Sequence, residues 1–256
     1  MKLTNNTILI TGGASGIGLG LAREFRKRDN QVIIANRSKH RLAAAKADGF
    51  VTYDVDMADA ASVRGLAERV IADFPALNGV IQNAGIMQAE SLQAGDSAKI
   101  QDETVAINLL GPMRLNNALI PHFLKQKSAF IMTVTSGLAF LPSAMFPTYC
   151  ATKAAIHSYT QGLRYQMQGT SIEALELAPP YVQTSLTGEH QMTDPGAMPL
   201  DAFIAEVMSI LTNNPETQEI LVERVHALRY AESKGIENYN QQFKALNDYM
   251  AAHRTV

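Results

Sequence analysis

Residues 11–18 read Thr-Gly-Gly-Ala-Ser-Gly-Ile-Gly, and this stretch decides the fold of the chain. It directly follows a strand-like run, Thr7 to Thr11, and it opens a segment with helical periodicity. Glycines here permit positive φ angles and a close approach of the backbone to a pyrophosphate, while the helix N-terminus offers free N–H donors. The spacing differs from G-x-G-x-x-G, so the position between first strand and first helix is the stronger evidence. The predicted dinucleotide contacts are Gly12, Ser15, Gly16, Ile17 and Gly18.

Short apolar runs alternate with longer helix-period segments along the rest of the chain, which is typical of βαβ units and a parallel sheet. Predicted strands span residues 7–11, 31–35, 50–53, 79–82, 129–134, 172–177 and 220–222. Predicted helices span residues 16–28, 39–46, 58–73, 102–124, 148–168 and 200–211. The strands are almost continuously apolar, as expected where helices cover both faces of a sheet. The sequence therefore predicts an α/β protein with a doubly wound, Rossmann-type parallel sheet in three α/β/α layers.

The whole chain, residues 1–256, is predicted to form a single dinucleotide-binding domain. Residues 185–199 contain several Gly and Pro residues and lack a period, so they are predicted to form a long loop or a short mobile helix, and they are a candidate lid. Residues 223–256 are predicted to form a helical extension with an apolar stripe. We expect that stripe to pack on its own fold or on a second subunit rather than on a ligand.

Composition excludes several classes of function. The 256 residues are 46% hydrophobic and 18% charged with a net charge of −2, so no bulk attraction to nucleic acid or an anionic membrane is expected. The single cysteine, Cys150, excludes an internal disulfide and is expected to be a packing residue. No apolar stretch reaches membrane-spanning length and no leader segment is evident, so a cytoplasmic location is expected.

A metal site is not predicted either. The six histidines form no His-x-x-x-His pair and have no companion cysteines. His157 lies one turn after Lys153 on the same predicted helix, and it is expected to be a packing or surface residue.

The end of the second strand bears on the choice of cofactor. An NAD site normally has an Asp or Glu there for the ribose 2′-hydroxyl, but this chain has Asn36 and Arg37. A guanidinium offers charge-assisted bonds to a 2′-phosphate, so NADP(H) is favoured over NAD(H). Alternatively, Arg37 is only solvated and Ser38 caps the next helix. A contribution from His40 or Arg41 to the same pocket stays open.

Tyr149 and Lys153 lie one helical turn apart, and Ser136 follows the apolar run at 129–134. Side chains at i and i+4 share a helix face, so the Lys153 ammonium is expected to approach the Tyr149 ring. A free phenol has a pKa near ~10, and a nearby cation favours its ionised form. Tyr149 is therefore a candidate general acid/base. Taken alone, the pair is also compatible with an ordinary amphipathic helix.

Together these motifs resemble the short-chain dehydrogenase/reductase family over nearly the whole chain. The likeness rests on the glycine turn, Asp54, the segment Gln82 to Gly85, Asn108, Ser136, the pair Tyr149 and Lys153, and the segment Pro179 to Thr184. The resemblance implies that Asn108 supports a proton-relay water, Ser136 orients the substrate oxygen, Tyr149 transfers the proton, and Lys153 binds the nicotinamide ribose and lowers the tyrosine pKa. It further implies these cofactor contacts: Asp54 on the adenine, Val55, Asn83, Ala84, Gly85, Pro179, Val182 and Thr184 on the nicotinamide carboxamide.

Two positions depart from the family pattern. Gln82 replaces an Asn but keeps the amide, so little effect is expected. Pro180 replaces a Gly, which fixes φ and removes an N–H beside the nicotinamide. The Pro-Pro pair and the C-terminal extension resemble the DltE-type bacterial branch more than the acyl-carrier reductases.

The first functional hypothesis is an NADP(H)-dependent oxidoreductase that transfers hydride between nicotinamide and a small to medium carbonyl or alcohol substrate. The alternative is a catalytically silent NADP(H)-binding sensor or scaffold, since the fold alone does not determine activity. An epimerase or dehydratase fits less well because little chain is left for a substrate domain. The resemblance also implies a homodimer or homotetramer.

The candidate walls of a substrate pocket flank these motifs and are mostly apolar, which favours a hydrophobic carbonyl compound. They are Met87, Gln88, Leu138, Phe146, Tyr181, Leu186 and Met192. The same residues would also fit a plain hydrophobic core, and Glu189 and His190 in the predicted lid either select a polar group or are solvated.

Overall fold

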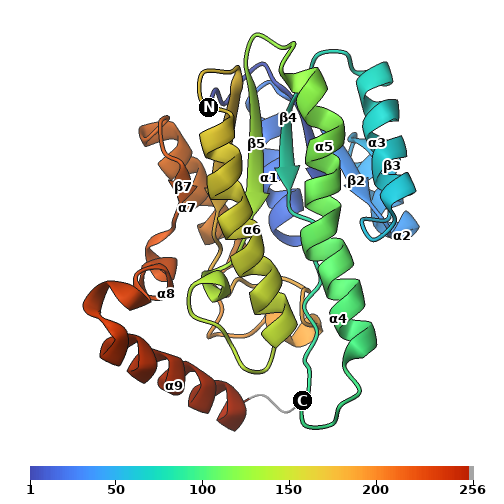
Figure 1. Ribbon diagram of the computed structural model, residues 1–256. Coiled ribbons are helices and arrows are strands. Elements are labelled where there is room, and N and C mark those ends of the chain that lie inside the picture. The colour runs from blue at the N-terminus through green and yellow to red at the C-terminus, as the bar shows by residue number, and fades with distance from the viewer. Residues whose placement is uncertain (254–256) are drawn as a thin grey trace.

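The computed structural model describes residues 1–253, and the strands within that range form one parallel sheet (Figure 1). The seven strands lie in the order β3-β2-β1-β4-β5-β6-β7 across the described part of the chain. Their bounds are β1 Thr7–Thr11, β2 Gln31–Asn36, β3 Val51–Asp54, β4 Leu77–Gln82, β5 Ala129–Val134, β6 Ile172–Leu177 and β7 Glu219–Ile220. Each lies within two residues of its predicted position at either end.

Helices connect the strands and cover the sheet. Their bounds are α1 Gly16–Arg26, α2 Lys39–Ala47, α3 Ala60–Asp73, α4 Ala98–Val105, α5 Gly111–Phe123, α6 Pro147–Gln166, α7 Leu200–Asn213, α8 His226–Arg229 and α9 Ile236–His253. Short 3-10 turns span Gly137–Ala139, Glu189–Met192, Glu223–Val225 and Ala231–Lys234, and a π-helical turn spans Ala106–Leu110.

Two hydrophobic cores confirm the predicted three-layer α/β/α architecture. One core joins the sheet to α1, α2 and α7, and Leu21, Phe25 and Phe203 are fully buried in it. The other joins the opposite face to α3, α5 and α6, with Leu66 and Phe123 fully buried. Figure 1 shows α5 and α6 on one side of the sheet and α1 on the other. Both faces are covered, which explains the continuous apolar strands.

The strand order reverses direction at β1, and this reversal positions the site. Thr11 at the end of β1 pairs with Ala35 of β2 on one side and with Gln82 of β4 on the other. The chain leaves β1 toward one half of the sheet and leaves β4 toward the other half, which opens a crevice beyond the carboxyl ends of these strands. The segments that follow β1, β2, β4, β5 and β6 therefore converge at one edge.

The predicted helix at 102–124 is wrong in one respect, because a π-helical turn at Ala106–Leu110 separates α4 from α5. Pro112 gives a physical reason. It has no N–H to donate to the carbonyl four residues earlier, that of Asn108, and its ring would crowd that oxygen. Widening the helix by one residue relieves the conflict, and π-turns often occur at functional sites.

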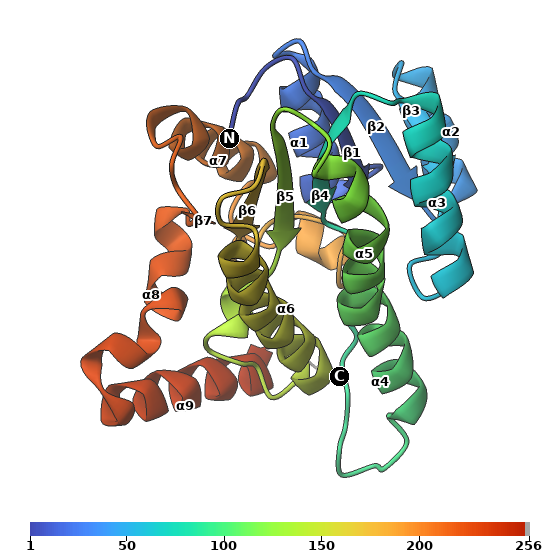
Figure 2. The same cartoon turned by 45° about the horizontal axis from the view of Figure 1, so that its top comes forward.

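The C-terminal extension is also less regular than predicted. It consists of the 3-10 turn Glu223–Val225, α8, a second 3-10 turn and α9, with a break at Gly235 where φ is +92°. A positive φ favours glycine and ends a helix. Figures 1 and 2 show α9 as an arm that returns across the N-terminal end of α6. The last three residues of the predicted extension, 254–256, lie outside the described residues.

Candidate active site

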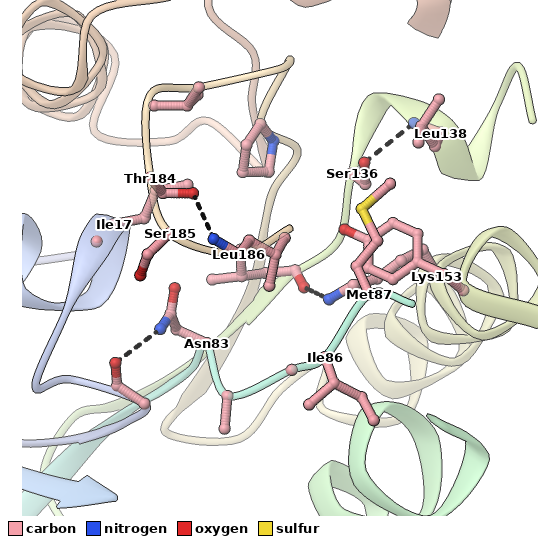
Figure 3. A pocket seen from close by; sticks show the side chains of 18 of the residues that line it. Ile17, Asn83, Ile86, Met87, Ser136, Leu138, Lys153, Thr184, Ser185 and Leu186 are labelled. Atoms are coloured by element: carbon pink, nitrogen blue, oxygen red, sulfur yellow. Dashed lines mark hydrogen bonds between the residues drawn. The ribbon is translucent and has the colours of Figure 1, made fainter. Parts of the chain in front are cut away.

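A cavity of about 730 Å³ lies at the carboxyl edge of the sheet. It brings together most of the residues that the sequence predicted: Gly12, Ser15, Gly16, Ile17, Asn36, Arg37, Val55, Asn83, Ala84, Gly85, Ser136, Tyr149, Lys153, Pro179, Val182 and Thr184. Figure 3 shows Ser136 and Lys153 on one side of the pocket, and Ile17, Thr184, Ser185 and Leu186 on the other. The predicted residues Gly18, Asp54 and Asn108 lie outside its lining.

The glycine turn packs directly on the segment that follows β4. Gly12 has a φ of +66°, and a Cβ built on it would lie 2.9 Å from the Cα of Ala84. A Cβ on Gly18 would lie 2.5 Å from Asn83 Nδ2, which itself donates a hydrogen bond to the carbonyl of Gly12 at 3.2 Å. Side chains at either glycine would push the two segments apart. Gly18 therefore acts in packing, behind the surface that faces the cavity.

Arg41 shapes the end of the cavity beside the glycine turn. Its Nη1 donates to Ser15 Oγ at 3.1 Å, and its backbone N–H donates to Ser38 Oγ at 3.3 Å, which caps α2. Arg37 also lines the cavity, where it is 60% exposed and lies 3.6 Å from the Glu103 carboxylate. The structure thus places two guanidinium groups at this end of the cavity.

Asp54 lies away from this cluster. Its side chain is 75% exposed, and its carboxylate lies 3.6 Å from Arg69. The cavity is lined instead by Val55, Asp56 and Met57, the three residues that follow. Sequence reasoning missed Asp56 and Met57, although their position directly after a strand was a usable signal.

Ser136, Tyr149 and Lys153 come from two elements that meet at the far end of the cavity. Ser136 follows β5, and its Oγ accepts a hydrogen bond from the Leu138 N–H at 3.1 Å. Tyr149 and Lys153 lie in the first two turns of α6, on one face, and all three side chains are buried. Lys153 Nζ lies 5.6 Å from the centroid of the Tyr149 ring and donates to the carbonyl of Val134 at 2.8 Å. The expected approach of the ammonium to the ring is therefore present.

The electrostatics of this pair differ from the expectation. Burial raises the pKa of Tyr149 to about 12, although a hydrogen bond with Ser136 acts in the opposite direction. Burial likewise lowers the pKa of Lys153 to about 8. Loss of hydration disfavours the charged form of each group. A pKa of about 12 keeps the Tyr149 side chain a neutral phenol at neutral pH.

Asn108 lies in the π-helical turn, beneath the cavity wall. Its Oδ1 accepts from the Ile86 N–H at 2.9 Å, and its Nδ2 donates to the Ile86 carbonyl at 2.8 Å. A second, longer contact joins Nδ2 to Thr152 Oγ1 at 3.4 Å. The side chain thus fixes the segment after β4 against α6, one residue beyond Gly85.

Of the predicted substrate walls, Met87, Gln88, Leu138, Tyr181 and Leu186 line the cavity. Phe146 belongs instead to a buried cluster behind it, and Met192 is 53% exposed outside its lining. Neither Glu189 nor His190 lines the cavity.

The C-terminal extension forms part of the cavity wall, a position that the sequence did not predict. Leu228, Leu246, Tyr249 and Met250 line the cavity. Met250 also belongs to the cluster that contains Tyr149, so the stripe packs on its own fold as predicted. The same stripe also lines the cavity, which the sequence did not predict. Periodicity identified the stripe, but only the course of the chain after Gly235 placed it over the pocket.

The predicted lid is held in place by contacts within residues 182–198. Val182, three residues before the segment at 185–199, pairs with Met198 near its end in a parallel bridge. The buried Gln191 side chain donates to the Val182 carbonyl at 2.7 Å and to Thr184 Oγ1 at 3.0 Å. This segment therefore has an internal anchor immediately beside the candidate cofactor contact Thr184.

His157 is more than a packing residue. Its Nδ1 lies 2.8 Å from the Glu176 carboxylate, which is fully buried and also accepts from Thr135 Oγ1 at 2.7 Å. Ligand atoms of His157, Glu176 and Glu219 lie within 4.8 Å of one another. Arg229, however, holds Glu219 through bonds of 2.8 and 3.1 Å. The cluster is thus a polar link between α6, the sheet and the C-terminal extension.

The cavity fits a dinucleotide. A positive-φ glycine turn lies at the N-terminus of α1, where Ser15 Oγ faces Arg41, and it would hold a pyrophosphate. The cavity runs from the arginines to Tyr149 and Lys153, and its volume is in the range of small-molecule sites.

Among the described residues, no helix is long and apolar enough to cross a membrane.

Comparisons with known proteins agree with this geometry. The family model of short chain dehydrogenases matches residues 6–194. The uncharacterized oxidoreductase DltE of Bacillus subtilis (strain 168) is 40% identical over 253 residues, which is 96% of this chain and 98% of that protein.

Two solved structures share the fold. A 3-ketoacyl-(acyl-carrier-protein) reductase from Brucella melitensis, complexed with NADH, aligns with a TM-score of 0.74 and 24% identity, covering 88% of this chain and 94% of its own. A short-chain dehydrogenase from Sphingobium yanoikuyae, in complex with NADPH, aligns with a TM-score of 0.76 and 21% identity, covering 98% and 97%.

Proposed function

The chain belongs to the short-chain dehydrogenase/reductase family of oxidoreductases, in its DltE-type branch, and from this premise we propose that it is an NADP(H)-dependent carbonyl reductase, reversible as an alcohol dehydrogenase. The observation that carries the proposal is the common cavity of the glycine turn with Ser136, Tyr149 and Lys153. A nicotinamide cofactor is supported by the relatives of the same fold whose structures contain NADH or NADPH. When bound, the nicotinamide exchanges hydride with the carbon of a carbonyl or alcohol.

The proposed proton transfer uses the neutral phenol of Tyr149. As negative charge develops on the carbonyl oxygen, the Tyr149 hydroxyl donates its proton and Ser136 hydrogen-bonds the same oxygen. Lys153 is held by the Val134 carbonyl beside the tyrosine ring, where a protonated ammonium favours the phenolate that forms. Asn108 positions these groups through Ile86 and Thr152.

The proposed cofactor contacts follow the lining of the cavity. The glycine turn would hold the pyrophosphate, Asn83 to Gly85 would support the nicotinamide half, and Thr184 would meet the carboxamide. Arg37 and Arg41 supply the cations that favour a 2′-phosphate and hence NADP(H). Asp54 points toward Arg69, so an adenine contact at this strand end is assigned instead to Val55 and its neighbours.

The proposed substrate is a small to medium apolar carbonyl compound or the matching alcohol. Met87, Leu138 and Leu186 line the reacting end of the cavity together with Leu246 and Met250 of the C-terminal arm. Apolar walls with few polar groups are typical of sites that bind by burial of hydrocarbon and orient through one or two hydrogen bonds. The assembly that we propose is a homodimer or homotetramer in the cytoplasm, which gel filtration with light scattering and cell fractionation would test.

The competing function is a catalytically silent NADP(H) sensor. A sensor needs the glycine turn and the arginines, but it has no chemical use for a buried serine, tyrosine and lysine at one end of the cavity. These three side chains share that end here, which favours the enzyme.

The substitution Tyr149→Phe tests the proposal. Removing the hydroxyl deletes the proton donor, so turnover should fall by about 10²–10⁴-fold, while NADPH affinity should stay within a few-fold. Turnover is measured as NADPH oxidation with a panel of aliphatic and aromatic aldehydes and ketones, and affinity by NADPH fluorescence titration. Near-parent turnover in Tyr149→Phe would refute the mechanism, and NADPH binding without oxidation of any substrate would favour the sensor.

A further inference from the structure

Glu90 lies outside the cavity lining, yet its buried carboxylate contacts the start of the helix that carries Tyr149 and Lys153. Glu90 as a whole is only 6% exposed to solvent. Oε1 accepts from the backbone N–H of Thr148 at 3.0 Å, and Oε2 accepts from Thr148 Oγ1 at 2.9 Å. Oε2 also accepts from Gln101 Nε2 of α4 at 3.3 Å. Three donors from two helices therefore converge on this one carboxylate.

The start of α6 has no cap of its own. Phe146 occupies the N-cap position and has no polar side-chain atom, and Pro147 follows without an N–H. Thr148 is thus the first residue of the helix with an N–H to satisfy, and Glu90 satisfies it from a distant segment. A carboxylate at this place also complements the positive end of the helix dipole.

The backbone of Glu90 adds a second link to the start of α6. Its N–H donates to the Met145 carbonyl at 3.0 Å, just before α6 begins. Glu90 also lies two residues after Gln88, the last residue of the cavity-lining segment that begins at Asn83. One residue therefore joins the wall that follows β4 to the turn that presents Tyr149.

We propose that Glu90 is a positioning residue for Tyr149, which fixes the first turn of α6 against the segment after β4 and so sets the place of the phenol in the cavity. The inference rests on the proposed function of Tyr149 as the proton donor. Tyr149 follows Thr148 directly, so a shift of the Thr148 backbone moves the phenol. Displacement of a reacting group by about 1 Å can cost ~10²-fold in rate.

The amide variant separates geometry from charge. In Glu90→Gln, the side-chain oxygen still accepts from the Thr148 N–H, while the new NH₂ group donates to Thr148 Oγ1 and to a flipped Gln101 amide. This variant keeps the shape of the network without the charge. Glu90→Ala removes the network altogether. A positioning role therefore predicts rescue by Gln and loss in Ala.

Asp59 provides a matched control. Its side chain caps α3 by accepting from the N–H of Ala61, the second residue of that helix, at 2.9 Å. Thr148 is likewise the second residue of α6. Asp59→Ala therefore removes a comparable cap from a helix that carries none of the proposed catalytic groups.

The experiment compares the parent protein, Glu90→Ala, Glu90→Gln, Thr148→Val and Asp59→Ala. We expect kcat to fall about 10–100-fold in Glu90→Ala, while KM for NADPH stays within about two-fold of the parent value. In Glu90→Gln, kcat should fall less than about three-fold. Asp59→Ala should lower Tm without lowering kcat. Equal loss in the Gln and Ala variants, or unchanged kcat in Ala, would overturn the proposal. If Glu90→Ala does not fold, the proposal requires that Thr148→Val lower kcat several-fold. An unchanged kcat in Thr148→Val would then overturn the proposal.

A second measurement separates this inference from the proposed function. Hydrogen–deuterium exchange of a peptide covering residues 148–154 reports the anchoring of α6 without any substrate. Exchange there should accelerate in Glu90→Ala and stay at the parent rate in Asp59→Ala, and equal rates in both would overturn the proposal. A parent protein that reduces no carbonyl compound would defeat the proposed function, while the exchange result would still decide whether Glu90 anchors the helix.

Discussion

At the scale of single residues, burial governs the chemistry of this site more than charge pairing does. Tyr149 and Lys153 are both enclosed, and burial moves the pKa of the tyrosine up to about 12 and that of the lysine down to about 8. Each group is thereby biased toward its neutral form. A neutral phenol is the form that can protonate a developing alkoxide, so the structure fits the reduction direction of the proposed reaction.

The proposed preference for NADP(H) rests on two guanidinium groups, those of Arg37 and Arg41. Arg41 is fixed by Ser15, whereas Arg37 is largely exposed and shares its charge with Glu103. Arg41→Ala should therefore weaken NADPH binding by about 10–100-fold, because a hydrogen bond to a charged group contributes about 1.5–3 kcal/mol. NADH binding should change little. Fluorescence titration of both cofactors measures the difference.

Controls for the cofactor prediction lie on the same stretch of chain. Lys39→Ala removes a neighbouring cation that does not line the cavity, and both affinities should stay near the parent values. Arg37→Asp should shift the preference toward NADH. If the unaltered protein binds NADH as tightly as NADPH, the assignment of NADP(H) is wrong.

At the scale of elements, the arm formed by α9 lines part of the cavity, at the end that we propose binds the substrate. Asn247 holds the arm in place: its Oδ1 accepts from the Ala144 N–H at 2.6 Å, and its Nδ2 donates to the Pro142 carbonyl at 3.2 Å. Leu246 and Met250 flank it and line the cavity. The loop that leads into α6 and the C-terminal helix are thus joined through one side chain.

Asn247→Ala should loosen this wall. Loss of hydrogen bonds worth about 1 kcal/mol each predicts a rise in KM of about 5–30-fold for apolar carbonyl substrates, with NADPH affinity unchanged. Steady-state kinetics with a homologous series of aliphatic aldehydes measures the effect, which should grow with chain length. Asp248→Asn, on the exposed side of the same helix, is the control. A KM that is independent of chain length in both variants would show that α9 does not contact substrate.

At the scale of the whole molecule, the buried lysine affects stability as well as chemistry. Lys153 has a pKa of about 8 in the folded protein against an ordinary value of 10.5, so the unfolded chain binds its proton more tightly. Between these two values the unfolded chain carries the proton and the folded protein does not. The contribution of Lys153 to the free energy of unfolding therefore rises with pH in this window.

Comparison with Lys153→Met isolates this effect from those of Tyr149 and Cys150, whose raised pKa values act in the opposite direction at higher pH. The free energy of unfolding of the parent minus that of the variant should rise by about 1 kcal/mol per pH unit between pH 8 and 10. Urea denaturation at a series of pH values measures it. A flat or falling difference would mean that Lys153 keeps its ordinary pKa in the folded protein.

Much of this molecule could be predicted because its signals are local. The α/β fold follows from apolar runs that alternate with helical segments, and the glycine turn follows from its place after the first strand. Gly12, Tyr149 and Lys153 sit where such patterns put them, since backbone freedom and the i, i+4 geometry depend on near neighbours in the sequence.

Other features depend on contacts between distant segments, and here the prediction was wrong or silent. The π-turn around Asn108 was missed, although Pro112 signals it in hindsight. The pKa of Tyr149 was expected to fall, but the degree of burial is set by the whole surrounding fold. Asp54 was expected at the cofactor, yet its carboxylate lies 3.6 Å from Arg69 of α3 and outside the cavity lining.

The sequence by itself determined the order of strands and helices, the glycine turn after the first strand and the identity of the groups that could do chemistry, because each depends on residues near one another along the chain. Only the tertiary structure decided that α9 lines the cavity, that Glu90 caps a helix nearly sixty residues further on, and that burial keeps Tyr149 neutral. These depend on which surfaces exclude water from one another, and no local pattern specifies that.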